Sequence, residues 1–374
     1  MDTSQEIIFQ IENEVSSFLN TFAKGTRFLA AVSGGADSMA LLAVLCAIGG
    51  ITREALPVVP GNATSDSFHF SCVHIEHGLR PAHESGGDAD HVRGFCGKNG
   101  IKCFIKRIAP GKIENFAKRK GTGIEAAARF FRHTALSKYA ARLGENTVIL
   151  LAHTKDDMLE TALMRLLRGS GPAGLAQMPA VSGRNGYVIA RPLLQLSRAE
   201  IECYLKAKNV AWREDSTNAD EKYLRNRIRH RLVPLLEESF ASWKAGIAQM
   251  TQTQLLAADF IAKEAKERVK WEVSLKFSDE LLFTDEANFF AQPQIIREEA
   301  VYQAVNDLSF LRAFAPRGSL QIKSIKRKVI RQFCEGGVNT ADLGKYNIKL
   351  EKGKIFVFKK RKEYFESRIS RLLK

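Results

Sequence analysis

The sequence contains no CxxC pair, although six cysteines are spread over its 374 residues. Zinc ribbons and iron–sulfur ligand sets use closely spaced cysteines, and disulfide frameworks belong mainly to small secreted chains. The spacing therefore disfavours all three kinds of site, and we interpret the cysteines as core or surface thiols. They are Cys46, Cys72, Cys96, Cys103, Cys203 and Cys334.

Long apolar runs are also missing from the sequence. The longest one, Met39–Ile51, has 13 residues, whereas a membrane-spanning helix needs about 20. The opening segment MDTSQEII lacks the basic and apolar regions of a secretory signal. We therefore expect a cytoplasmic protein without a membrane span.

Acidic residues are scarce near the carboxyl end. Residues 321–374 hold 16 basic and 5 acidic residues, so they carry +11 of the total formal charge of +15. A basic excess confined to one region indicates an anionic partner, such as a nucleic acid, that binds there. A charged face that only contacts solvent remains the alternative.

The pattern of the first 220 residues predicts an α/β fold with a parallel sheet that binds a nucleotide. Short apolar runs alternate with helical patterns, as in βαβ units. The strands are expected at Arg27–Val32, Phe68–Ile75, Ile101–Ile108 and Thr147–His153. The helices are expected at Ser38–Ile48, in a stretch that ends before Gly100, at Ile124–Arg142 and at Asp156–Arg168.

A Gly/Pro-rich loop, GSGPAGLAQMP, follows Arg168, and a short strand GYVIARPLL and a helix Arg198–Lys208 come next within the first 220 residues.

Residues 221–374 are predicted to form a mainly helical region that ends in a basic β-hairpin. The segment from Tyr223 to about Gln303 is expected to be nearly all helix. YNIKL and KIFVFKK, on either side of a turn at Lys352-Gly353, have the pattern of a hairpin.

The strongest local motif lies between the first expected strand and an apolar helix. It consists of Ser33, Gly34, Gly35, Ala36, Asp37 and Ser38. Glycines let backbone N–H groups surround an anion, and the helix N-terminus adds partial positive charge. No lysine follows the second glycine, so this is not a GxxxxGK[ST] loop. The alternative is a tight turn with Ser38 as the helix N-cap.

This loop resembles the PP-loop of the N-type ATP pyrophosphatases, which split ATP into AMP and pyrophosphate. The resemblance implies that the backbone N–H groups from Ser33 to Ser38 hold the pyrophosphate and that Asp37 holds Mg²⁺.

Three further motifs follow later strands. They are HIEHGLRP from His74, EAAARFFR from Glu125 and LAHTKDDMLET from Leu151. Each has a plain alternative. The histidines have no complete metal-ligand set, Glu125 and Arg129 could form a surface ion pair, and Asp157 and Glu160 could simply stabilise a first helical turn.

The four motifs are more informative together than singly. Each follows an expected strand, and ligands bind at the carboxyl ends of parallel strands, so one site could include all four. With RGSGPAGLAQM and the segment from Asp215 to Arg229, they resemble the tRNA(Ile)-lysidine synthase family over residues 26–232. Three residues depart from the family pattern. Glu76 stands where Asp is usual, Thr154 stands where a second His is usual, and Met158 stands where Gln is common.

The resemblance implies an ATP- and Mg²⁺-dependent ligase that forms a carbon–nitrogen bond. Members adenylate the C2 oxygen of the wobble cytidine in tRNA(Ile) with the anticodon CAU, and L-lysine then displaces AMP to give lysidine. The implied catalytic residues are Asp37, Arg129 (with Arg132 as second choice), Asp157 and Glu160, of which the last two hold the lysine.

The tRNA is expected to contact basic residues on two segments, and a homodimer is plausible from the resemblance. The expected tRNA-binding residues are Arg225, Arg227, Arg229, Lys359, Lys360 and Arg361.

Three other functions were weighed. A PP-loop tRNA thiolation enzyme is the main alternative, and the missing CxxC pair counts against it. An amidating or NAD-forming PP-loop synthetase would not need the basic carboxyl-terminal region. An RNA-binding module with a degenerate nucleotide pocket is disfavoured because Asp37, Arg129, Asp157 and Glu160 are all present.

Overall fold

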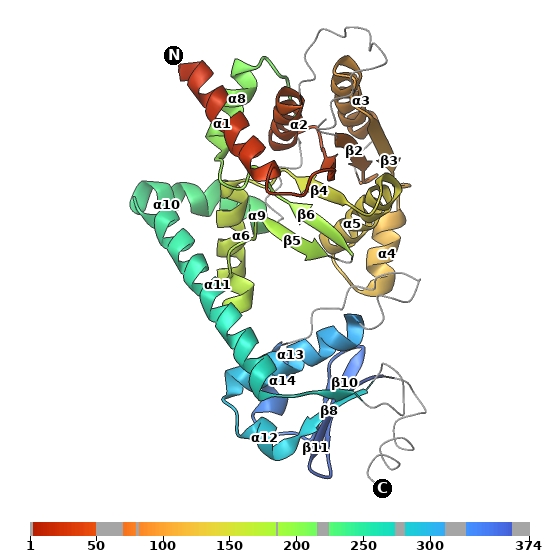
Figure 1. Cartoon of the computed structure of the whole chain (residues 1–374), viewed down its shortest axis with the longest axis vertical. Helices are drawn as coiled ribbons and strands as arrows, with labels where there is room; N and C mark the ends of the chain where they lie inside the picture. Colours follow the sequence, from red (N-terminus) through yellow and green to blue (C-terminus); the bar gives the residue numbers. More distant parts are fainter. Residues whose placement is uncertain are drawn as a thin grey trace. The chain divides into compact units, whose positions relative to one another are not determined.

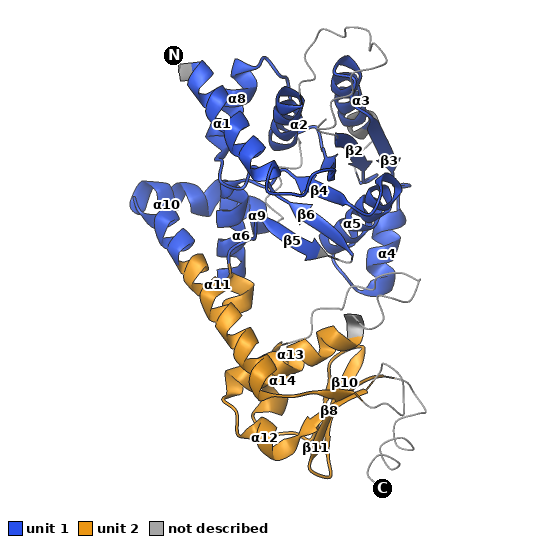
Figure 2. Cartoon of the chain, in the orientation of Figure 1, with its two compact units in different colours: residues 1–169, 177–249 blue, residues 170–176, 250–374 orange. Residues whose placement is uncertain are grey.

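A computed structural model describes residues 3–49, 70–79, 82–184, 186–214, 224–273, 281–310 and 327–360. The chain forms two compact units, shown in different colours in Figure 2. The first unit comprises residues 1–169 and 177–249, and the second comprises residues 170–176 and 250–374. Each unit has its own hydrophobic core.

The first unit is built on a six-stranded sheet with the order β3-β2-β1-β4-β6-β5 (Figure 1). All neighbouring strands are parallel except the edge pair β5 and β6. This sheet confirms the predicted α/β fold class. The strands are β1 (Arg27–Ala31), β2 (Phe70–Glu76), β3 (Cys103–Arg107), β4 (Thr147–Leu151), β5 (Val181–Arg184) and β6 (Tyr187–Ala190).

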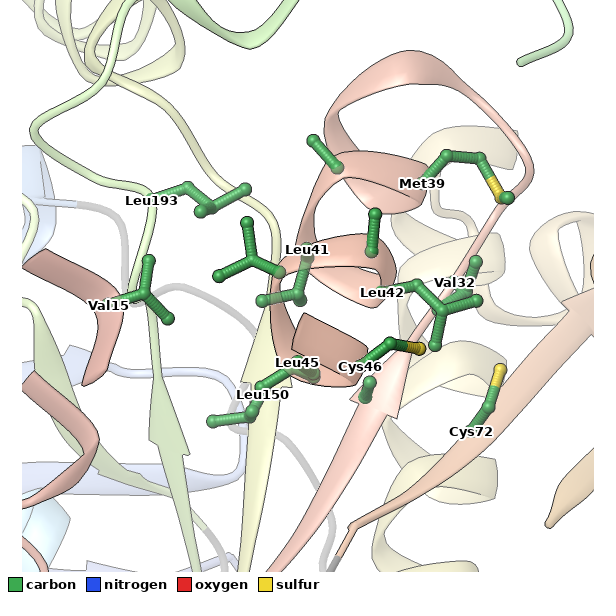
Figure 3. Packing of buried hydrophobic residues seen from close by; sticks show 14 of the residues in the cluster. Val15, Val32, Met39, Leu41, Leu42, Leu45, Cys46, Cys72, Leu150 and Leu193 are labelled. Carbon is green, nitrogen blue, oxygen red and sulfur yellow. The ribbon is translucent and has the colours of Figure 1, made fainter. Parts of the chain in front are cut away.

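Helices pack on both faces of this sheet. They are α1 (Thr3–Leu19), α2 (Ala36–Ile48), α3 (Ala82–Lys98), α4 (Lys112–Lys120), α5 (Ile124–Leu143), α6 (Lys155–Leu167) and α8 (Arg198–Ala207). Helix α2 is apolar on all sides and almost fully buried, as expected for a helix inside a core. Figure 3 shows Leu41 and Leu45 of α2 on the side of Val15 of α1 and Leu150 of β4, and Leu42 on the side of Val32. Leu136 and Ala140 of α5 pack on the opposite face of the sheet.

The carboxyl-terminal part of the first unit continues in helices. They are α9 (Leu224–Arg227), a π-helical turn η2 (Ile228–Leu232), α10 (Val233–Ser239) and the start of α11 (Trp243–Arg268). π-Helical turns are rare and often occur at functional sites.

Strand register brings the motifs that follow β1 and β4 to the same edge of the sheet. Ala31, the last residue of β1, pairs with Val73 of β2 and Leu151 of β4. The chain segments that follow β1 and β4 therefore leave the sheet at the same level. This edge is where a parallel sheet collects a ligand.

The second unit contains a five-stranded antiparallel sheet with the order β7-β8-β11-β10-β9. Its strands are β7 (Glu272–Val273), β8 (Leu281–Asp285), β9 (Thr340–Asp342), β10 (Tyr346–Glu351) and β11 (Lys354–Lys359). Its helices are α7 (Pro172–Leu175), α12 (Glu286–Phe290), α13 (Gln294–Phe310), α14 (Arg327–Cys334) and the end of α11.

The predicted basic hairpin is confirmed as β10 and β11. Its turn residues Lys352 and Gly353 have φ values of 48° and 74°, which suit a two-residue turn of the I′ type. The expectation of nearly continuous helix from Tyr223 to about Gln303 was wrong at β7 and β8. A short apolar run such as LLFT has no periodicity that separates strand from helix, and pairing with β11 decides its conformation.

The part of the chain that the structure describes contains no helix that is both long and apolar enough to cross a membrane.

Candidate functional site

The loop between β1 and α2 is closed around the hydroxyl of Ser38. This oxygen accepts hydrogen bonds from the backbone N–H groups of Ser33 and Gly34, both at 3.1 Å, and it donates to the carbonyl oxygen of Gly35 at 2.9 Å. Ser38 thus fixes the shape of the turn from inside. The alternative of Ser38 as an N-cap does not hold, because the N-cap of α2 is Gly35 and it has no side-chain cap.

Gly34 is required by the local geometry of this loop. Its φ of +98° is a conformation that residues with a Cβ rarely adopt. The carbonyl oxygen of Gly34 accepts a hydrogen bond from the N–H group of Arg213 at 3.0 Å. The loop is therefore held from two sides at the N-terminus of a buried helix, a setting that suits a bound phosphate.

Asp37 lies in the first turn of α2 and forms an ion pair with Arg198 at 2.9 Å. Burial raises the pKa of the Asp37 carboxyl, and the nearby negative charge of Asp157 raises it further, whereas Arg198 lowers it. A divalent cation beside these two carboxylates would offset the repulsion that Asp157 exerts on the charge of Asp37. Their oxygen atoms are the donors that Mg²⁺ prefers, so the residues fit this ion.

Asp157 has both a structural and an electrostatic role. Its Oδ2 accepts from the backbone N–H of Thr154, and the Thr154 hydroxyl accepts from the N–H of Asp157, which completes a capping box for α6. The alternative role of Asp157, which is to stabilise the first turn of its helix, is therefore confirmed for its Oδ2 atom. The other oxygen, Oδ1, accepts from Nη2 of Arg225 at 2.6 Å.

Glu160 is 4% exposed and is the most buried acid at this edge of the sheet. Its two oxygens accept hydrogen bonds from Nε of Arg225 at 2.7 Å and from Nε and Nη2 of Arg229 at 2.6 and 3.0 Å. The two arginines come from α9 and η2. The predicted lysine-binding acids are therefore paired with two residues that were predicted to bind tRNA.

Arginines also surround His153, which follows β4. Burial lowers the pKa of His153 to about 3, and the positive charges of Arg191, Arg132, Arg225 and Arg129 add to this effect. Arg129 and Arg132 thus lie close enough to His153 to act on its charge. The ring of His153 is neutral at neutral pH.

We expect His153 to make the first unit sensitive to acid. The unfolded chain protonates this ring below about pH 6.5, whereas the folded protein does not do so until about pH 3. Stability is therefore complete above pH 6.5 and is lost as the pH falls towards 3.

Replacing His153 with Asn should make the loss of unfolding free energy between pH 7 and pH 5 smaller by at most about 2 kcal/mol. Urea unfolding of the wild type and the variant at both pH values measures this difference. Equal losses in the two proteins would show that His153 does not carry the effect.

The remaining predicted residues lie in different places. Arg227 belongs to α9, next to the arginine pair. Lys359 ends β11 in the second unit, and Lys360 forms an ion pair with Asp342 at 2.5 Å. Arg361 and the segment Asp215–Tyr223 lie outside the described residues.

The histidine motif after β2 is partly structural. His74 is buried, and its Nδ1 is 2.9 Å from the carbonyl oxygen of Val32, so it ties β2 to the residue before the loop. Burial lowers the pKa of His74. Glu76 pairs with Arg107 at 3.0 Å, so it is not directed towards a metal.

Sequence reasoning missed two arginines at the site. Arg198 pairs with Asp37 through its Nη1, and its backbone N–H donates to Asp156 at 2.7 Å. Arg213 pairs with Asp88 of α3 at 2.6 Å beside the loop. Arg198 could have been suspected, because SRAE at Ser197–Glu200 is a capping-box signature that places an arginine at a helix start.

Several known proteins are similar in sequence to this chain. The family model of the PP-loop domain matches residues 8–236. The tRNA(Ile)-lysidine synthase of Treponema denticola is 38% identical over 262 residues, which are 70% of this chain and 53% of that protein. The protein of the same name from Pseudomonas aeruginosa is 35% identical over 68% of this chain and 52% of its own length.

A solved structure shares the fold. It is the U34-tRNA thiolase NcsA from Methanococcus maripaludis with its [4Fe-4S] cluster, with a TM-score of 0.50 and 14% identity over 67% of this chain and 80% of that one. The chain spans about half the length of the curated relatives that it matches.

Proposed function

This chain belongs to the PP-loop domain family, and on that premise we propose that it ligates L-lysine to the wobble cytidine of tRNA(Ile) with the anticodon CAU. The product is lysidine, and ATP is converted into AMP and pyrophosphate. The observation that carries this proposal is the cluster of Asp157 and Glu160 with Arg225 and Arg229, next to the loop at Ser33–Ser38.

The first half of the proposed reaction activates the base. The C2 oxygen of the cytidine attacks the α-phosphorus of ATP, and the bond to the β-phosphate oxygen breaks, so that pyrophosphate leaves. In the Ser33–Ser38 loop, the N–H groups of Ser33 and Gly34 already donate to the Ser38 hydroxyl, so those of Ala36, Asp37 and Ser38 at the start of α2 are the ones suited to hold the departing phosphates. Mg²⁺ held by Asp37, with Asp157 close by, would neutralise charge on the phosphate oxygens.

Arginines are suited to the activated intermediate. Arg129, with Arg132 as second choice, lies in the positive field around His153 and would stabilise the negative charge that develops on the phosphate. Fixed positive charges aimed at developing negative charge usually make the largest single contribution to catalysis.

The second half of the reaction uses lysine, which carries both signs of charge. Two carboxylates and two guanidinium groups alternate within 2.6 to 3.8 Å of each other here. The ammonium groups of lysine would pair with Asp157 and Glu160, and its carboxylate would pair with Arg225 or Arg229. The ε-ammonium first loses one proton to solvent, and the free amine then forms a bond to C2 while the C2–oxygen bond breaks. AMP leaves with that electron pair, and a second amine proton is released to solvent.

The tRNA would bind through phosphate contacts. Arg225, Arg227 and Arg229 in the first unit, and Lys359, Lys360 and Arg361 in the second, are the proposed contacts, because lysine and arginine supply most of the affinity for nucleic acids. Arg225 and Arg229 already form ion pairs with Glu160, so they would have two roles. Arg227 is the arginine of this helical segment whose proposed role is tRNA binding alone. A homodimer and a cytoplasmic location remain predictions.

The test is a ligation assay with purified protein, ATP, Mg²⁺, radiolabelled lysine and tRNA(Ile) transcripts. We expect label to become fixed in the transcript with a CAU anticodon and not in the same transcript with GAU, with one AMP formed for each lysine. Absence of fixed label would overturn the proposal. Fixation of labelled sulfur instead would identify the thiolation alternative.

A further inference from the structure

Three cysteines that are far apart in the sequence have their thiols together in the first unit. The Sγ atoms of Cys72, Cys96 and Cys103 all lie within 4.8 Å of one another. Cys72 lies on β2, Cys96 near the end of α3 and Cys103 at the start of β3. Cys72 and Cys103 are paired in the register of the two strands, so their side chains leave the sheet on the same face.

The surroundings of these thiols are apolar, and Cys103 is the least buried of the three. Cys72 and Cys96 are fully buried in the main core, and Cys103 is half-buried at its border. Figure 3 shows Cys72 with Cys46 of α2 on this side of the sheet. A metal ion could therefore reach the group from the side of Cys103.

The thiols already interact as a set. The thiols of Cys72 and Cys96 are both in hydrogen-bond contact with the sulfur of Cys103. Metals bind the thiolate form of cysteine, so a bound ion would replace these contacts.

We propose that Cys72, Cys96 and Cys103 form a three-thiolate site for a soft metal ion, Zn²⁺ or Cu⁺. A zinc–sulfur bond of about 2.3 Å in tetrahedral geometry places two sulfurs about 3.8 Å apart. The three thiols need only a small contraction to reach this spacing. Thiolates select soft ions over Mg²⁺, so the site would not compete with Asp37 for its ion.

Binding releases the thiol protons to solvent and leaves three sulfur–metal bonds. The fourth position of a Zn²⁺ ion would be filled by water on the side of Cys103, whereas Cu⁺ needs no fourth ligand. Such a bond network would join α3 to β2 and β3. Cys96 lies one helical turn beyond Val92, whose Cγ2 is 3.7 Å from the place of a Cβ at Gly34, so the metal would brace the helix that supports the Ser33–Ser38 loop.

The three sulfur atoms belong to the hydrophobic core and not to the site at the carboxyl ends of the parallel strands. In the sheet register Cys72 lies beside Ala30, ahead of the point where the loop begins. The site therefore has a structural role and does not deliver sulfur to a substrate. It also does not depend on the proposed ligase activity.

The experiment is a metal titration of the reduced, metal-free protein. One sample is titrated with Zn²⁺ against a chromophoric chelator, and a second with Cu⁺ against a copper-specific chelator. We expect one ion per chain for at least one of the two metals, and a higher melting temperature in its presence. Binding of only one of them supports the site and identifies its ion.

Variants assign the binding to these residues. Loss of a residue that only hydrogen-bonds to a metal ligand costs roughly tenfold to hundredfold in metal affinity. Cys96→Ser and Cys103→Ser each remove a direct ligand, so each should weaken the affinity by more than this. Co²⁺ gives a second measurement, because its sulfur-to-metal absorption should weaken in each variant. This readout does not depend on activity.

The control variant is Cys334→Ser. Cys334 is equally buried and stands alone among the described cysteines of the second unit, so its loss should leave metal affinity unchanged. The proposal is overturned if the wild type binds neither ion, or if Cys96→Ser binds as tightly as the wild type. It is also overturned if Cys334→Ser loses binding to the same extent.

Discussion

Replacing Asp37 with Asn is expected to lower tRNA-dependent AMP formation by about a hundredfold to a thousandfold. Asp37 would hold the Mg²⁺ that neutralises charge on the leaving phosphates, and such electrostatic stabilisation is usually the largest single catalytic term. The fold should survive. Burial and the charge of Asp157 raise the pKa of Asp37, so the ionised carboxyl is unfavourable in the folded protein and a neutral amide relieves it. We therefore expect an unchanged or higher melting temperature together with lost activity.

The matched control is Glu202→Gln. Glu202 also pairs with Arg198, at 2.7 Å, but it lies one turn further along α8. This variant should keep AMP formation within a few-fold of the wild type. Activity of Asp37→Asn at the wild-type level would contradict the assignment of Asp37, and an equal loss in Glu202→Gln would indicate that the position of Arg198 is what matters.

Replacing Glu160 with Gln should impair the lysine half of the reaction. Removing a charge-assisted contact worth about 1.5–3 kcal/mol corresponds to a roughly tenfold to hundredfold rise in the KM for lysine or fall in turnover. Adenylation of the tRNA should largely survive. Single-turnover measurement of adenylated tRNA, compared with lysine saturation curves, separates the two halves.

The same substitution should also destabilise the first unit. It removes the more buried of the two carboxylates that pair with Arg225 and Arg229. Breaking a buried pair costs about 3–5 kcal/mol, and partial exposure of the arginines reduces this to about 1–3 kcal/mol. Asp157→Asn should have a smaller effect on stability, because the amide keeps an oxygen that can cap α6.

The second unit offers a control for this loss of stability. Glu298 is also a buried glutamate, and it pairs with Arg327 and Arg331 at 3.7 and 3.3 Å. Glu298→Gln should lower stability but leave the KM for lysine unchanged. Loss of adenylation in Glu160→Gln with an unaltered lysine KM would place Glu160 with Asp37 at the phosphates instead.

Much of this protein could be predicted from local sequence. The four expected strands of the parallel sheet, the helices after them and the hairpin at Lys352-Gly353 all exist in the structure. So does the tight loop at Ser33–Ser38, because the glycines, the adjacent buried strand and the apolar helix are all local signals. Such elements are determined by residues that are neighbours in the chain.

The partners of the site residues were decided only by the tertiary structure. Arg198 is 161 positions from Asp37, and Arg225 is 65 positions from Glu160, so no spacing rule connects them. The conversion of LLFT into β8 depends on pairing with β11. The three thiols meet because β2 and β3 are adjacent and α3 returns across them. A sequence pattern reports contacts within one element, whereas ion pairs, strand pairs and thiol clusters depend on how separate elements pack together.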